Sequence, residues 1–233
     1  NQVAEPYRRL RNTLRILLGN LDGFKQCGHP AHLEYTLLDR WILERLHEVV
    51  AECRKAYETC EFRKVFNSLN QFCTTDLSAI YIDATKDRMY CDAPDSPRRR
   101  ASQCAMHEIF TAIARLLAPI LAFTADEAWE HAGFTTGSVH EQDFPQPDPA
   151  FAPGAATQQA ARLFEIKYVI QTAIEARIQA REFTRNNEAD VDLTVTAGDA
   201  ALLPLLNDRD FASEFFIIAN LRAAVGDGLV ATA

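Results

Sequence analysis

The stretch Asp76-Leu77-Ser78-Ala79-Ile80-Tyr81-Ile82-Asp83-Ala84-Thr85-Lys86-Asp87-Arg88-Met89-Tyr90 is an amphipathic segment with a charged Lys-Asp-Arg step near its end. Its apolar residues continue a stripe that starts upstream, at Phe62, and recurs every three or four positions. This spacing is typical of one face of a helix. The pattern therefore predicts a helix from about Phe62 to Asp87.

The surrounding sequence lacks the residues that usually break helices. No glycine occurs between Gly28 and Gly133, and no proline between Pro30 and Pro94. Long helices are expected in such a sequence. The apolar stripes place further helices at 6–21, 37–59, 97–118 and from about 124 onwards. Ser96 and Pro97 suit the start of the third of these, and Pro119 should end or kink it. Thr124 to Glu127 has the spacing of a capping box, which predicts the start of the last helix there. Amphipathic helices of this length bury their stripes most simply in an antiparallel bundle.

The character of the chain changes after His140. Prolines at 145, 147, 149 and 153, with Gly154, indicate a stiff linker. A helical pattern follows at 157–180, then a strictly alternating strand pattern at 190–196, short helices near 200–206 and 210–219, and a strand near 221–225. The predicted fold is therefore mainly α. It consists of an antiparallel helix bundle (1–144), a Pro-rich linker (145–155) and a small α/β subdomain (156–233).

The charge of the chain is unevenly distributed. The net charge is −8, but residues 1–140 hold 17 basic and 18 acidic residues, so most of the excess negative charge lies after residue 140. Nineteen of the 24 basic residues are arginine, whose planar guanidinium suits phosphates and base edges. The composition therefore permits nucleic-acid binding only through local clusters in the first part of the chain.

No constellation of catalytic or metal-ligating residues is readable. The chain has no phosphate-cradling loop, no H-E-x-x-H motif and no nucleophile elbow. Glu44 and His47 have the E-x-x-H spacing of di-iron bundles, but a second copy is missing, so a solvated helix face is expected. The six cysteines are widely spaced and are expected to be reduced thiols rather than zinc ligands. We predict no catalytic residue, no bound metal or cofactor in this chain, and no membrane span.

Two arginine clusters could contact RNA. In the first helix, Arg8, Arg11 and Arg15 share one face, and Asn12 beside them could hydrogen-bond a base edge. The second cluster, Arg98, Arg99 and Arg100, opens a helix, where the helix dipole disfavours cations and so favours an anionic partner. The alternative is that these arginines form ion pairs with acids such as Glu5, Asp22 or Asp95.

Stacking on RNA bases would require exposed aromatic residues. Most aromatic side chains fall on the apolar stripes, where packing in the core is the expected role. By their surroundings in the sequence, the better candidates are Tyr7, Phe134 and Phe183.

Five blocks occur in a recognisable order. They are Arg11-Asn12-Thr13-Leu14-Arg15-Ile16-Leu17-Leu18-Gly19-Asn20-Leu21, Leu38-Asp39-Arg40-Trp41-Ile42-Leu43, the Asp76–Tyr90 stretch, Arg99-Arg100-Ala101-Ser102-Gln103, and Leu117-Ala118-Pro119-Ile120-Leu121-Ala122-Phe123-Thr124-Ala125-Asp126-Glu127-Ala128-Trp129. Together they resemble the helical anticodon-binding region of isoleucyl-tRNA synthetase, a class I enzyme. The resemblance is strongest over residues 5–145.

The resemblance implies a non-catalytic portion of a cytoplasmic ligase. Its partners would be the anticodon stem-loop of isoleucine tRNA and an upstream catalytic domain of the same polypeptide, which would use ATP and Mg²⁺. Zinc could bind in modules outside this chain. The same region of valyl-tRNA synthetase ranks second, because the Asp76–Tyr90 run looks more like the isoleucine enzymes. A non-catalytic helical scaffold that binds protein remains a further alternative.

Overall fold

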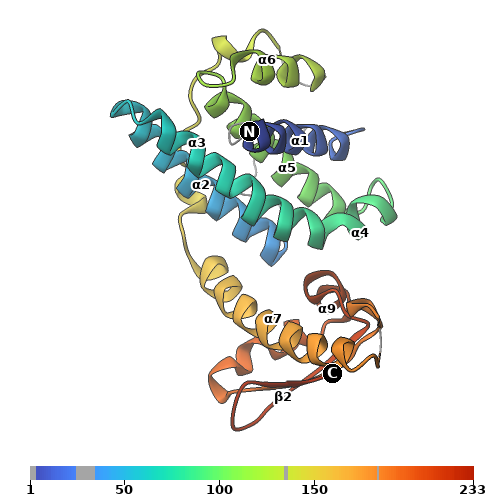
Figure 1. Cartoon of the computed structure of the whole chain (residues 1–233). Helices are drawn as coiled ribbons and strands as arrows, with labels where there is room; N and C mark the ends of the chain where they lie inside the picture. The colour runs from blue at the N-terminus through green and yellow to red at the C-terminus, as the bar shows by residue number, and fades with distance from the viewer. Residues whose placement is uncertain (1–3, 25–34, 134–135, 183) are drawn as a thin grey trace. The chain divides into compact units, whose positions relative to one another are not determined.

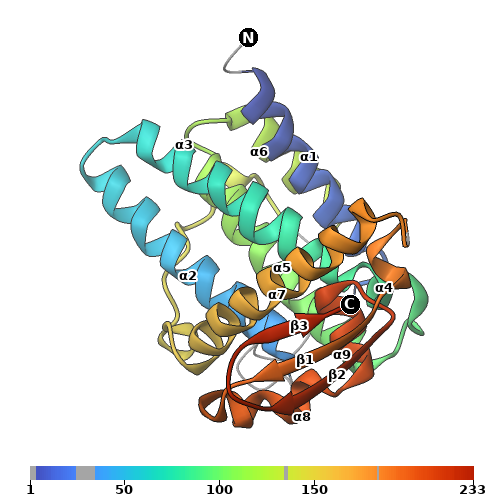
Figure 2. The same cartoon turned by 60° about the horizontal axis from the view of Figure 1, so that its bottom comes forward.

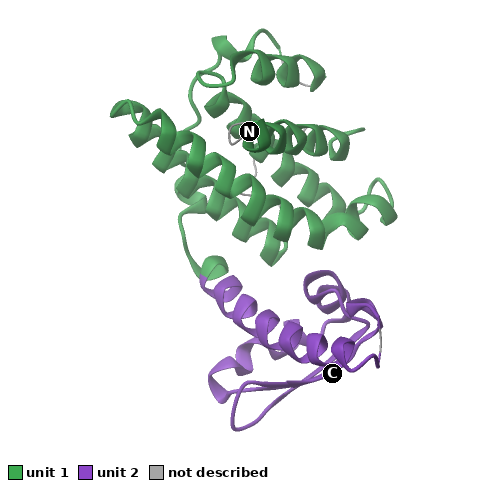
Figure 3. Cartoon of the chain, in the orientation of Figure 1, with its two compact units in different colours: residues 1–157 green, residues 158–233 purple. Residues whose placement is uncertain are grey.

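The structure, a computed structural model, describes residues 4–24, 35–133, 136–182 and 184–233 of the 233-residue chain. These residues divide into two compact units, 1–157 and 158–233 (Figure 3). The first unit is helical, and the second combines helices with a small sheet. The predicted fold class, a mainly α bundle followed by a small α/β part, is confirmed.

Long helices that pack side by side build the first unit (Figure 1). Their bounds are α1 Ala4–Asn20, α2 Leu37–Glu58, α3 Phe62–Gln71, η2 Phe72–Ile82, α4 Asp83–Cys91, α5 Pro97–Leu117 and α6 Ala122–His131. Helix α2 packs against α3, η2 and α5, whereas α1 packs against α5 and α6. The apolar stripes predicted from the sequence lie at these contacts, as shown by Leu10, Leu14 and Leu17 of α1, which are buried.

The segments α3, η2 and α4 follow one another without a break, and the middle segment, η2, is π-helical. The sequence explains this winding, because a buried residue recurs every four positions: Val65, Leu69, Cys73, Leu77, Tyr81, Thr85 and Met89. In an α-helix with 3.6 residues per turn, each step of four residues advances about 40° beyond a full turn. The wider π turns reduce this drift and keep the series facing the core. Phe62, which the sequence placed on the inward stripe, is instead 52% exposed.

A buried polar network joins α2, η2, α4 and α5. Oδ1 of Asp39 accepts hydrogen bonds from the hydroxyl groups of Tyr81 (2.6 Å) and Ser102 (2.8 Å). Nη1 of Arg88 donates to Ser102 Oγ (2.9 Å) and lies 3.4 Å from Asp39 Oδ2. These residues come from three of the ordered sequence blocks, so these blocks are linked by a shared structural role.

The start of α2 carries a capping box, but the start of α6 does not. Thr36 Oγ1 accepts from the amide of Asp39, and Asp39 Oδ2 accepts from the amide of Thr36. The capping box predicted at Thr124 is wrong, because α6 begins before it, at Ala122. Thr124 and Glu127 instead contact α1.

The segment between α6 and α7 contains two short 3₁₀ turns, η3 Val139–Glu141 and η4 Pro149–Phe151, and it packs on α2. Nδ1 of His47 accepts from the amide of Asp148 (3.1 Å), and the ring of Phe151 stacks on the imidazole at 5.2 Å. The expectation of a solvated Glu44–His47 face is wrong, since the two residues are only 5% and 6% exposed. Both side chains hold the chain that leads into α7.

Glu44 supplies the cap of α7 from another helix. Its Oε2 atom accepts from the amides of Gly154 (3.2 Å) and Thr157 (2.9 Å) and from the hydroxyl of Thr157 (2.5 Å). The first amides of a helix lack partners within the helix, and a negative charge there is favourable. The residues 145–157 are therefore fixed to the bundle rather than extended away from it.

The second unit contains most of α7 and a three-stranded sheet. The helices and strands from α7 onwards are α7 Ala155–Gln179, η5 Asn186–Glu188, β1 Asp190–Val195, η6 Ala197–Leu202, α8 Leu203–Leu206, α9 Arg209–Phe216, β2 Asn220–Val225 and β3 Val230–Thr232. The strand order is β2-β1-β3, with β1 parallel to β2 and antiparallel to β3 (Figure 2). The strand β3 was not predicted from the sequence. The side chain of Asn207 bonds both the amide and the carbonyl of Ala223, and so occupies part of the β2 edge.

Cysteine chemistry differs from the expectation at one position. Cys53, Cys60, Cys73 and Cys91 are free thiols. Cys104, however, is disulfide-bonded, so the expectation of uniformly reduced cysteines is wrong there.

No described helix combines the length and apolarity needed to cross a membrane.

Candidate nucleic-acid interface

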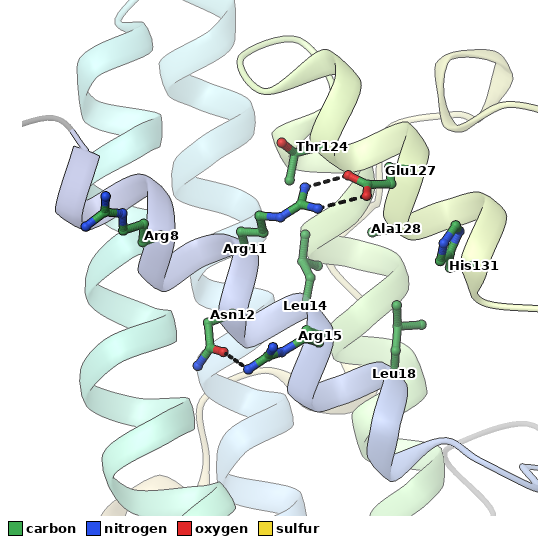
Figure 4. Close-up of a pocket in the computed structure, with 10 residues that line it drawn as sticks. All are labelled: Arg8, Arg11, Asn12, Leu14, Arg15, Leu18, Thr124, Glu127, Ala128 and His131. Atoms are coloured by element: carbon green, nitrogen blue, oxygen red, sulfur yellow. Dashed lines mark hydrogen bonds and ion pairs between the residues drawn. The ribbon is translucent and has the colours of Figure 1, made fainter.

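A pocket of about 350 Å³ lies between α1 and α6 (Figure 4). Its lining consists of Arg8, Arg11, Asn12, Leu14, Arg15, Leu18, Thr124, Glu127, Ala128 and His131. Leucine and alanine side chains form the apolar part of the wall, and charged or polar groups surround it. All four residues predicted on the first helix therefore line one cavity.

Helix α1 presents this set because its two faces differ. Leu10, Leu14 and Leu17 are buried in the bundle, and the polar residues at positions 8, 11, 12 and 15 fall on the other side at intervals of three or four. Arg9 lies outside the pocket lining and pairs with Glu5 at 3.3 Å. Arg9, adjacent in sequence to Arg8, thus falls on a different side of α1 from the other three arginines.

Arg11 is held by a carboxylate across the pocket. Its Nη1 and Nη2 atoms donate to Oε2 and Oε1 of Glu127 at 2.5 and 2.8 Å (Figure 4). This paired contact lowers the pKa of Glu127 and raises that of Arg11. Both side chains remain 47% exposed, so solvent screens the pair. Arg11 forms part of the wall and has its charge balanced there.

Arg8 and Arg15 carry the positive charge that remains. Nη2 of Arg15 donates to Oδ1 of Asn12 at 2.8 Å, which orients both side chains along the pocket (Figure 4). Within the described part of the chain, neither Arg8 nor Arg15 forms an ion pair with a carboxylate. Two guanidinium groups and one carboxamide thus face solvent beside an apolar cavity. This combination can hold a phosphate and the edge of a base.

Residues of α6 that sequence reasoning missed complete this pocket. The hydroxyl of Thr124 lies 3.1 Å from that of Tyr7, so Tyr7, predicted as a stacking residue, is tied to the pocket rim. His131 lines the opposite end from Thr124 along α6. The signal for α6 was its helical spacing at 124, 127, 128 and 131, but nothing local indicates that it faces α1. Phe134 and Phe183 lie outside the described residues.

The second predicted cluster is engaged within the chain. Arg98 donates to both carboxylate oxygens of Asp92, at 2.6 and 2.8 Å, and this lowers the pKa of Asp92. Arg99 donates to the backbone carbonyl of the same residue at 2.7 Å. The unfavourable charge at the start of α5 is thus offset by an acid from the preceding turn.

Arg100 has a different internal role. It donates to the carbonyl of Gly23 at 3.1 Å and to Oε1 of Gln103 at 2.9 Å. Gln103 in turn donates to the carbonyl of Asn20. Cations and donors at a helix C-terminus satisfy its free carbonyls, so this pair caps the end of α1. The structure does not place Arg98, Arg99 or Arg100 in the α1–α6 pocket, and their binding to RNA stays a prediction.

Metal-ligating residues do not gather in the described ranges. Over these residues, no group of three or more His, Cys, Asp or Glu side chains could hold a metal ion. Glu44 and His47 are instead occupied by backbone amides of the segment that precedes α7.

Comparison with known proteins identifies what this chain is similar to. The family model described as the anticodon-binding domain of tRNA ligase matches residues 39–193. The isoleucine–tRNA ligase of Symbiobacterium thermophilum is 37% identical over 231 residues, which is 97% of this chain and 24% of that protein. The isoleucine–tRNA ligases of Brevibacillus brevis and Carboxydothermus hydrogenoformans are 38% and 36% identical over 95% and 94% of the chain. The chain spans about a quarter of the length of these curated relatives.

Proposed function

The chain belongs to the anticodon-binding domain family of tRNA ligases, and we propose that it binds the anticodon stem-loop of isoleucine tRNA for an isoleucine–tRNA ligase. The similarity to isoleucine–tRNA ligases over nearly the whole chain supports the choice of amino acid. The observation that carries the binding surface is the α1–α6 pocket, where Arg8, Asn12 and Arg15 meet beside apolar side chains.

The pocket suits an RNA loop for chemical reasons. Bases in a loop can be splayed out of the stack, so that their faces contact apolar or aromatic groups and their edges accept hydrogen bonds. In this pocket, Leu14, Leu18 and Ala128 offer apolar contact, Asn12 offers a carboxamide, and the guanidinium groups attract the phosphate backbone. A chain with a net charge of −8 attracts RNA through such a local site rather than through its whole surface.

The reaction itself would take place elsewhere in the full-length enzyme. ATP and Mg²⁺ would be used by a catalytic domain upstream in the same cytoplasmic polypeptide, and any zinc would bind in another module. The residues of this chain do not fit these groups, because the nucleotide-binding loops and a metal-ligating cluster are missing from its described part. The role of this chain is to supply tRNA affinity and discrimination.

Titration of the chain with fluorescently labelled RNA hairpins tests this proposal. The hairpins are the anticodon stem-loops of isoleucine and valine tRNAs and a hairpin with the isoleucine stem and a scrambled loop. We expect tightest binding to the isoleucine stem-loop. Tighter binding to the valine hairpin would support the valine alternative, and equal affinity for all three would rule out loop recognition. No affinity for RNA would favour the protein-binding scaffold.

Variants of α1 locate the site. We expect Arg8→Ala and Arg15→Ala to weaken binding, because each removes a charge from the pocket rim. Arg9→Ala is the matched control, since Arg9 lies on the same helix, pairs with Glu5 and does not line the pocket. Equal effects of the three substitutions would show that general charge, and not the pocket, governs affinity.

A further inference from the structure

One phenylalanine of α6 is almost completely exposed to solvent. The side chain of Phe123 is 93% exposed, whereas the next most exposed phenylalanine among the described residues, Phe62, is 52% exposed. The other face of α6 is well packed, with Ala125, Ala128 and Trp129 buried. A ring left in water at an ordered position of a packed helix gains nothing from the fold itself.

Phe123 does not itself line the α1–α6 pocket, but it is close in sequence to residues that do. It directly precedes Thr124 and lies four residues before Glu127, and both of these line the pocket. Residues four apart share a helix face, so Phe123 stands at the edge of the pocket-lining face of α6. Glu127, the residue of that face nearest to Phe123 in helical position, forms the paired contact with Arg11.

The surroundings of the ring favour RNA over protein as its partner. An apolar docking surface for a protein usually extends over several hundred Å². Beside Phe123, the pocket instead presents the charged groups of Arg11 and Glu127, with Arg8 and Arg15 further along α1. Single-stranded RNA is bound by this pairing of elements, because bases stack on exposed aromatic rings and phosphates contact nearby cations.

We propose that Phe123 is a stacking platform for one unpaired base of the anticodon loop, next to the base-binding pocket. This inference rests on the proposed function and adds a specific binding residue to it. The ring would fix the position of one base, so that the adjoining nucleotide lies over the polar groups of the pocket.

Substitutions of Phe123 test the stacking role with the isoleucine stem-loop. Base stacking on an aromatic side chain corresponds to a roughly 5- to 150-fold loss of affinity on substitution by alanine. We expect this loss for Phe123→Ala, near-normal affinity for Phe123→Trp, and a loss like that of alanine for Phe123→Leu, which keeps apolar surface but has no ring. Phe62→Ala on α3 is the control for an exposed ring outside the pocket, and its affinity should match that of the unmodified chain.

A fluorescent base gives a readout that does not depend on affinity. 2-Aminopurine is placed at each loop position in turn, and its fluorescence is followed as the unmodified chain binds. The fluorescence should be quenched most strongly at the loop position whose base stacks on Phe123. The quenching at that position should disappear with Phe123→Ala at saturating protein. An unchanged melting temperature of the variant would show that the fold is intact, as expected for an exposed side chain.

The outcomes separate this inference from the proposed function. If the unmodified chain binds no hairpin, the proposed function fails, and the stacking role fails with it. If it binds the isoleucine hairpin and Phe123→Ala binds equally well, only the stacking role is overturned. Normal affinity of Phe123→Leu would also overturn stacking, because an aliphatic contact would then be sufficient.

Discussion

The hydroxyl of Tyr81 donates a 2.6 Å hydrogen bond to Oδ1 of Asp39, and neither side chain has measurable exposure to solvent. Arg88, also buried, lies on the other oxygen of the carboxylate. Burial and the neighbouring negative charge raise the pKa of Tyr81 well above its usual range, so the phenol stays protonated and remains a donor. A buried charge is tolerated only when it is paired and hydrogen-bonded.

Substitution of Tyr81 by phenylalanine should therefore destabilise the chain. A hydrogen bond to a charged group contributes about 1.5–3 kcal/mol to the free energy of unfolding, and the substitution would leave Asp39 short of one donor. Urea denaturation measures the loss. Tyr57→Phe is the control, since Tyr57 donates at the same distance to a neutral carbonyl, that of Leu116. A larger loss for Tyr57→Phe would contradict the importance of the network.

The salt dependence of RNA binding should distinguish the two arginine clusters. Each phosphate that the protein no longer neutralises flattens the slope of log affinity against log salt by roughly 0.7–0.9. We expect such a flattening of the slope for the double variant Arg8→Ala/Arg15→Ala. Substitution of Arg98, Arg99 and Arg100 by alanine should change the slope less, because these groups are bonded within the chain. A greater flattening with the triple variant would make Arg98–Arg100 the main phosphate-binding residues.

Glu44→Gln should loosen the start of α7. The substitution removes the negative charge of the carboxylate that accepts hydrogen bonds from the amides of Gly154 and Thr157. Loss of such a cap lowers the free energy of unfolding by about 0.5–2 kcal/mol. Hydrogen exchange should show faster exchange at these two amides. Glu52→Gln is a suitable control on the same helix, since among the described residues Glu52 accepts a hydrogen bond only from the exposed hydroxyl of Ser68. Unchanged protection in Glu44→Gln would show that the Glu44 charge does not hold this segment.

His47 should make the stability of the chain depend on pH below about 6.5. Burial lowers its pKa from 6.5, so below that pH the unfolded chain takes up a proton that the folded chain does not. Stability therefore falls as the pH falls towards the pKa of the folded state, by at most about 1.4 kcal/mol per pH unit. We expect a shallower slope of unfolding free energy against pH in His47→Gln than in the unmodified chain. Denaturation at several pH values between 6.5 and 5 measures this slope.

Two other titratable groups also affect how stability depends on pH. Burial also lowers the pKa of His107, so His47→Gln should reduce the slope without abolishing it. Hydrogen bonds from Arg162 lower the pKa of Asp199 from 3.8 to about 2, so its stabilising contribution is lost only below about pH 4. An identical slope in His47→Gln and the unmodified chain between pH 6.5 and 5 would exclude His47.

Local patterns predicted the helices well, because burial of a stripe is written into residues three or four apart. Ser96 and Pro97 correctly indicated where α5 starts, but the capping predicted for the Ser96 side chain is wrong, because its hydroxyl donates to Asp92 instead. The pattern could not show that Glu127 would meet Arg11, 116 residues away in sequence, since such pairs arise from packing. The burial of Glu44 and His47 likewise depends on a distant segment, and the three residues of β3 are too few to give a periodic signal.

The helical spacing of the arginines pointed to the first helix, where Arg8, Arg11, Asn12 and Arg15 line one pocket. That these residues bind RNA stays a prediction, because the spacing shows only a shared face. It could not separate residues that face a ligand from residues that hold the fold. Arg99 and Arg88 belong to the ordered blocks and Arg98 directly precedes one of them, and each of the three is bonded to groups inside the chain.

The π-helical winding of Phe72–Ile82 also makes the length of this segment critical. Removal of a single residue between Cys73 and Tyr81 would interrupt the four-residue repeat of buried side chains, because each residue of a helix turns the chain by about 100° around the axis. Unless the winding changed to compensate, the phenol of Tyr81 and the guanidinium of Arg88 would turn together away from Asp39. A change of length in this segment should therefore be more disruptive than an exchange of its exposed side chains.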